Sequence, residues 1–119
     1  MVKQRAASES PLNLDAVFSA LSDPIRRGIV ERLGRGEASV GELAEPYAVS
    51  APAISRHLRV LESAGLVERR KQGRVHRCRV RPKAVELVSR WVEDQRLFWN
   101  RQFDQLDRYL ADNPTGDSK

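Results

Sequence analysis

The chain has little cysteine and histidine and no long apolar run. Its 119 residues include one cysteine and two histidines, which excludes an internal disulfide and leaves no cysteine-rich metal site. No apolar run reaches the roughly 18–20 residues of a membrane span, and the N-terminus has no apolar stretch typical of a secretory signal. A chain of this length is one domain, or one domain with tails. We therefore expect a cytoplasmic protein with no membrane contact, no metal and no cofactor.

Signals of catalysis are also missing. The sequence has no Gly-rich phosphate loop, no His-Glu-x-x-His and no Gly-x-Ser-x-Gly motif. Four carboxylates, of Glu93, Asp94, Asp104 and Asp107, lie in a long charged helical pattern, where a solvated surface is the simpler interpretation. We predict that the protein is not an enzyme.

Positive charge is what the chain has in excess, and it is concentrated in one segment. Residues 38–83 contain ten basic and four acidic residues, a net charge of +6, whereas the remaining residues contain eleven basic and twelve acidic ones, a net charge of −1. A concentrated basic surface favours a polyanion such as DNA, RNA or an anionic membrane. A salt-bridged, solvated surface is the alternative. The choice between a polyanion-binding surface and a solvated one depends on which elements carry the charge.

Apolar spacing predicts two helices before the basic segment. In residues 12–21, apolar side chains recur at i, i+3, i+4 and i+7. Asp23 and Pro24 are typical of a helix start, as N-cap and first helical residue, so a second helix is expected to begin there. Gly34 and Gly36 are expected to end it.

The basic segment itself is predicted to contain a helix-turn-helix. A short helix over residues 39–48, kept brief by Pro46, precedes a helix that begins after Ser50 and ends at Gly65. Ile54, Leu58 and Leu61 would hold the second of these helices to the core. Two short helices joined by a four-residue turn have the spacing of that motif.

A basic hairpin is predicted to follow. Residues 66–71 and 74–80 alternate in an extended pattern around Gln72-Gly73, with glycine at the second turn position. Cys78 on the second strand is interpreted as a small buried hydrophobe, and a redox switch is the minor alternative.

Residues 83–111 form the last helical pattern and carry most of the aromatic side chains. The domain should therefore span residues 12–111, between a disordered arm, residues 1–11, and a disordered tail, residues 112–119. The apolar stripe is more than so small a monomer can cover, so we predict a homodimer interface through the first and last helices. A small-molecule pocket lined by the stripe is the weaker alternative. The interface would contain Leu14, Val17, Phe18, Val88, Trp91, Val92, Phe98, Trp99, Phe103, Leu106 and Leu110.

Placing the second helix of the motif in a major groove assigns candidate DNA contacts. Ser55 and Arg56 can reach base edges, and hairpin cations can contact the backbone or a minor groove. His57 is interpreted as a phosphate contact, with a purely structural role as the alternative. The full predicted set is Ser50, Ala51, Pro52, Ser55, Arg56, His57, Arg59, Arg69, Arg70, Lys71, Arg74 and Arg77.

Three stretches together, ALSDPIRRGIVERL, SVGELAEPYAVSAPAISRHLRVLESAGLV and ERRKQGRVHRCRV, resemble the ArsR family of winged helix-turn-helix repressors. The resemblance covers roughly residues 12–82, and the last helix fits too. It implies a mainly α fold with a small β-hairpin wing, and a dimeric regulator that binds an operator near its own gene until a signal arrives.

The resemblance does not extend to the metal sites of the family. Where many members have a Cys-Val-Cys-Asp-Leu motif, this chain has Ser39-Val40-Gly41-Glu42-Leu43, and residues 83–111 contain no histidine. We therefore predict a metal-independent member, with double-stranded DNA carrying an inverted repeat as its partner and an unidentified small molecule as its effector. The alternative function is a protein-interaction module that uses the long C-terminal helix without DNA.

Overall fold

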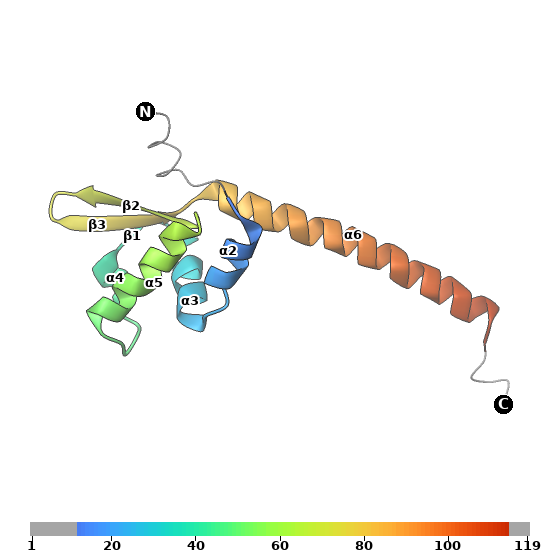
Figure 1. The fold of residues 1–119 in the computed structure, drawn as a ribbon. Helices are drawn as coiled ribbons and strands as arrows, with labels where there is room; N and C mark the ends of the chain where they lie inside the picture. The colour runs from blue at the N-terminus through green and yellow to red at the C-terminus, as the bar shows by residue number, and fades with distance from the viewer. Residues whose placement is uncertain (1–11, 115–119) are drawn as a thin grey trace. The chain divides into compact units, whose positions relative to one another are not determined.

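The computed structural model describes residues 12–114, which form two compact units that divide after Leu87. The predicted arm, residues 1–11, lies outside the described residues, as do residues 115–119 of the predicted tail. Figure 1 shows the elements in chain order. The helices are α2 (Leu14–Ala20), α3 (Pro24–Leu33), α4 (Val40–Ala44), α5 (Ala51–Ser63) and α6 (Pro82–Asp112), and the strands are β1 (Ala38–Ser39), β2 (Val67–Gln72) and β3 (Val75–Val80).

The helix starts follow the caps that the sequence predicts. The Asp23 carboxylate accepts hydrogen bonds from the backbone N–H groups of Ile25 and Arg26 at 2.9 and 3.0 Å, and Pro24 begins α3. The hydrogen bond from Arg26 N–H lowers the pKa of the Asp23 carboxyl below its ordinary value. The Ser50 side chain accepts from the N–H of Ala53 at the start of α5. Each side chain satisfies a donor that the first helical turn leaves unpaired.

Helix α4 is shorter than the prediction of residues 39–48. It begins with a capping box, in which the Ser39 hydroxyl accepts from Glu42 N–H and the Glu42 carboxylate accepts from Ser39 N–H. It ends at Ala44, because Pro46 has no N–H to donate to the carbonyl of Glu42.

The three strands form an antiparallel sheet in the order β1-β3-β2. The predicted hairpin is present, but its turn is displaced by one residue. Gln72 pairs with Val75, so Gly73 and Arg74 form the loop, rather than Gln72 and Gly73. Gly73 has a φ of +65° at the first loop position and Arg74 has no positive φ, a pattern typical of a type II′ turn. Strand β1 was not predicted, because two residues are too short to show alternation.

Helices α3, α4 and α5 lie against one face of the sheet (Figure 1), and the core of the first unit lies between them and the sheet. Ile54, Leu58 and Leu61 of α5 are fully buried, as predicted. Val17 is also fully buried. It is therefore a core residue of the single chain, whereas Leu14 and Phe18 of the same helix keep exposed surface.

Candidate nucleic-acid interface

Helix α5 presents one buried and one exposed face. Arg56 and Arg59 are exposed, together with Ala51 and Pro52 of the first turn, whereas Ser55 is half-buried. Neither arginine has an ion-pair partner among residues 12–114. The exposed face therefore offers two unpaired guanidinium groups and a hydroxyl on a rigid helix, which suits contact with base edges and phosphates.

His57 is held in place from outside its own helix. Its Nδ1 lies 3.2 Å from Nη1 of Arg26 and 3.9 Å from the Asp23 carboxylate. Arg26 is itself fixed, because its Nε donates to the carbonyl of Ala20 at 2.6 Å. Arginine only donates hydrogen bonds, so this contact makes Nδ1 the acceptor and leaves Nε2 to carry the proton. His57 thus has a structural contact that links α3 to α5, and its Nε2–H remains a donor for a phosphate.

Most arginines of the wing are engaged within the chain. The Arg69 guanidinium forms two 3.0 Å hydrogen bonds with Glu62 of α5, and these raise its pKa. Arg70 and Arg77 both lie 3.5 Å from the carboxylate of Glu37. The sequence pattern predicts no partner for these three residues, because Glu37 is distant in the chain and Glu62, seven residues before Arg69, lies on a different element.

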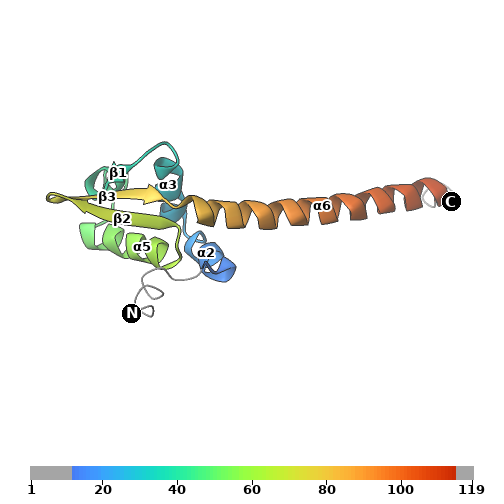
Figure 2. The same cartoon turned by 90° about the horizontal axis from the view of Figure 1, so that it is seen from above.

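The hairpin tip carries the cations of the wing that form no ion pair within residues 12–114. Within the part of the chain that the structure describes, Lys71 and Arg74 have no ion-pair partner, and both are exposed. The tip and the first turn of α5 lie at the same end of the first unit in both views (Figures 1 and 2). Among the described residues, the positive charge of the predicted set that has no ion-pair partner is therefore carried by Arg56, Arg59, Lys71 and Arg74.

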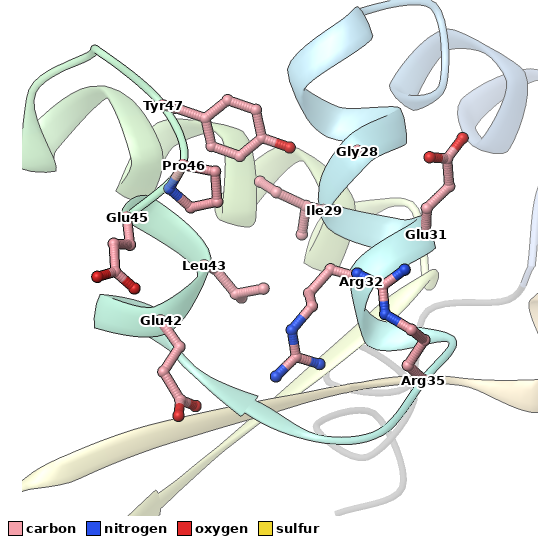
Figure 3. A pocket seen from close by; sticks show the side chains of 10 residues that line it. All are labelled: Gly28, Ile29, Glu31, Arg32, Arg35, Glu42, Leu43, Glu45, Pro46 and Tyr47. Carbon is pink, nitrogen blue, oxygen red and sulfur yellow. The ribbon is translucent and has the colours of Figure 1, made fainter.

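A cavity of about 550 Å³ lies beside the helix-turn-helix, between α3 and the α4 segment (Figure 3). The Tyr47 side chain points from the α4–α5 turn towards α3, and its hydroxyl occupies the space that a β-carbon at Gly28 would need. Gly28 therefore lets the turn of the motif pack closely on α3. The charged side chains around the cavity are those of Glu31, Arg32, Arg35, Glu42 and Glu45.

Cys78 lies on β3 and is buried. Burial raises the pKa of its thiol, and this effect outweighs the opposite influence of Arg69. Because the thiolate is the reactive form, this environment favours the small buried hydrophobe over the redox switch.

We expect Cys78 to resist alkylation in the native protein. Treatment with iodoacetamide near neutral pH should leave the intact mass unchanged for as long as the protein stays folded, and denaturant should allow one adduct to form. Rapid stoichiometric labelling of native protein, at the rate seen for a free thiol, would contradict this assignment.

The second unit exposes a continuous apolar face on α6. Phe98 and Trp99 form an edge-to-face pair with ring centroids 5.4 Å apart, and Phe103 lies 6.1 Å from Trp99. These three side chains are 44–56% exposed. Further exposed apolar side chains of the same helix are Trp91, Val92, Leu97, Leu106, Tyr109 and Leu110.

Within residues 12–114, no helix is long and apolar enough to cross a membrane. No group of three or more histidine, cysteine or acidic residues in the same range is arranged to hold a metal ion.

The fold and the basic face together define a winged helix-turn-helix protein. The family model of a helix-turn-helix domain matches residues 21–70. The regulator Rv2034 of Mycobacterium tuberculosis is 41% identical over 87 residues, which are 73% of this chain and 78% of that protein. The arsenical resistance operon repressor of Escherichia coli is 34% identical over 105 residues, 87% of this chain and 90% of the relative.

Solved structures of transcriptional regulators are also similar to this chain. An ArsR-like transcriptional regulator from Rhodococcus is 36% identical, with a TM-score of 0.67 over 81% of this chain and 91% of the other. A homodimeric winged helix-turn-helix domain from Mycobacterium bovis is 29% identical, with a TM-score of 0.58 over 70% and 80%. The chain belongs to the ArsR family of transcriptional regulators. The predictions of a winged helix-turn-helix fold and of a regulator rather than an enzyme are confirmed.

Proposed function

We propose that the protein is a homodimeric repressor that binds an inverted-repeat operator and controls its own or a neighbouring operon in the cytoplasm. The observation that carries the proposal is the exposed face of α5, where Arg56 and Arg59 have no ion-pair partner within residues 12–114. A helix capped at Ser50 and fixed by three buried side chains can present this face to a major groove.

The wing supplies the second part of the DNA contact. Lys71 and Arg74 at the hairpin tip contact the phosphate backbone or an adjacent minor groove. Arg69, Arg70 and Arg77, which have partners in the free protein, hold the wing in place and contribute less to the affinity. Ser50 and His57 donate hydrogen bonds to phosphates through the hydroxyl and Nε2–H, which their capping and structural contacts leave available.

Dimerisation brings two reading helices to one duplex. The exposed stripe of α6 pairs with that of a second copy, and Leu14 and Phe18 of α2 extend the interface. The supporting observations are the exposed aromatic side chains of α6 and a relative whose solved structure is described as homodimeric. In a dimer, each copy binds one half-site, and the half-sites lie about one helical turn apart.

Selection of bound duplexes from a random-sequence DNA pool tests the proposal. The wild-type protein should enrich an inverted repeat, and its affinity should fall steeply with salt because phosphate contacts release counterions. Failure to enrich any sequence, with affinity that does not respond to salt, would favour the alternative of a protein-interaction module. The same assay, repeated with candidate small molecules, would reveal an effector by release of the duplex.

The protein acts without a metal. Ser39 and Gly41 stand where the two thiolates lie in other members, and the Ser39 hydroxyl is engaged with Glu42 in the α4 capping box.

We expect zinc, cadmium and arsenite at low micromolar concentration to leave DNA binding unchanged. The reason is that Ser39 and Gly41 supply no thiolate and α6 supplies no imidazole. Equilibrium dialysis should find no stoichiometric binding, and titration of the protein–DNA complex should show no release. Tight binding of one equivalent of any of these ions would overturn the expectation.

A further inference from the structure

Two glutamines interrupt the apolar face of α6 at its centre. An α-helix turns about 100° per residue, so side chains seven residues apart fall in nearly the same row. Val88, Gln95, Gln102 and Tyr109 form such a row, with Trp91, Val92, Phe98, Trp99 and Leu106 on either side of it. The charged side chains of the same stretch lie on the other side of the helix, at Arg90, Glu93, Asp94, Arg101, Asp104 and Arg108.

Within the described residues, the two glutamines of the apolar face make no polar contact that stabilises α6 as a single helix. Gln95 is half-buried and Gln102 is exposed, and no hydrogen bond is formed by either side chain within residues 12–114. Once an apolar partner covered the face, each amide would lose its water and would need a donor and an acceptor in the partner. A polar pair inside an apolar helix interface is a known means of fixing register.

We propose that Gln95 and Gln102 set the register of an antiparallel α6–α6 contact between two copies of this chain. In that contact, Gln95 of one copy forms hydrogen bonds with Gln102 of the partner subunit, twice per dimer. The inference rests on the proposed homodimer and adds the residues that align it.

We infer that the apolar face is covered by a second copy of the chain, because the face is complementary to an antiparallel copy of itself. When a two-fold axis between Phe98 and Trp99 relates two antiparallel copies of α6, three pairs face each other across the contact. They are Gln95 and Gln102, Trp91 and Leu106, and Val88 and Tyr109. At the centre Phe98 lies opposite Trp99. On either side of this pair amides meet amides and a large side chain meets a smaller one, which suits an isologous interface. A parallel pair would instead place Trp91 against Trp91 and Val88 against Val88, which leaves crowding at one level and space at the other.

The same row makes other registers unfavourable. A slip of one heptad in the antiparallel pair would place Gln95 opposite Tyr109, or Gln102 opposite Val88. In the second slip, the Gln102 amide of each copy would lie against a valine, which offers neither donor nor acceptor. In the first, the Gln95 amide of each copy would exchange an amide partner for a single phenol hydroxyl. Such a slip also displaces the two copies by about 10 Å along the helix axis, which would change the distance between their reading helices.

Cross-linking in the full-length protein tests the alignment. Gln95→Cys and Gln102→Cys are prepared separately, and Cys78, which is buried, is retained. Under mild oxidation, a mixture of the two variants after subunit exchange should form a disulfide-linked dimer, whereas each variant alone should form at least tenfold less. Efficient cross-linking of each variant alone would indicate a parallel pair and overturn the proposal.

A second experiment tests the role of the amides. Gln95→Leu/Gln102→Leu should sediment as a dimer at least as stable as the wild type, but selection from pools with varied half-site spacing should recover several spacings instead of one. Asn100→Leu, on the charged side of α6, is the matched control and should keep one spacing. A double-leucine variant with the wild-type spacing preference would overturn the register role. A wild-type protein that sediments as a monomer would instead contradict the homodimer itself.

Discussion

Arg56→Ala is expected to lower the affinity for the selected duplex by about 1–3 kcal/mol and to leave the affinity for a scrambled duplex nearly unchanged. Arg56 is exposed on α5, between the buried side chains of Ile54 and Leu58 that fix the orientation of the helix. A guanidinium in this position can donate two hydrogen bonds to a guanine edge. Its loss should therefore cost energy only where that base is present.

Arg74→Ala is expected to behave differently. Arg74 lies in the hairpin loop next to Gly73, without an ion-pair partner in the described part of the chain. Its charge is available to a phosphate, which is the same in every sequence. The substitution should weaken binding to both duplexes and make the salt dependence shallower by about 0.9 in the logarithmic slope. Lys71→Ala should have the same effect.

Arg79→Ala is the matched control for the wing. Arg79 lies on β3 but is paired with Glu68 at 3.1 Å, so its removal should change neither the specificity nor the salt slope. The measurement is affinity against salt concentration for both duplexes with each variant. If Arg56→Ala lowered both affinities equally and Arg74→Ala lowered only the specific one, the roles of base reader and backbone contact would be reversed.

The parts of this site that could be predicted are those set by local sequence. Asp23 and Ser50 cap helices through atoms two or three residues away, and the spacing of Ile54, Leu58 and Leu61 defines the buried side of α5. Its exposed side follows directly. Local signals of this kind fix the existence and orientation of an element.

The parts that could not be predicted depend on contacts distant in sequence. Arg26 and His57 are 31 residues apart, and Arg70 and Glu37 are 33 residues apart. No spacing rule brings such pairs together, so the sequence could not separate engaged arginines from free ones. Val17 illustrates the same limit, since its apolar spacing fits a core face and an interface equally well.

Trp99→Glu is expected to convert the dimer to a monomer and to reduce the apparent affinity for the selected duplex by roughly 10²–10⁴-fold. Trp99 is 50% exposed and lies between Phe98 and Phe103 on the apolar face of α6. A carboxylate at this position would have to lose its water without a partner when a second copy covers it. Two linked reading helices gain affinity because the second binds at a high effective concentration, and a monomer loses that gain.

The fold of the reading unit should survive this substitution, because Trp99 belongs to the separate unit that begins at Val88. Leu97→Glu is the matched control: Leu97 is similarly exposed, at 43%, but its place on the helix is on the charged side of α6. Sedimentation at micromolar concentration, circular dichroism and DNA affinity should all match the wild type for Leu97→Glu. If Trp99→Glu remained a dimer with unchanged affinity, the apolar face of α6 would not be the interface, and the stripe would need another occupant.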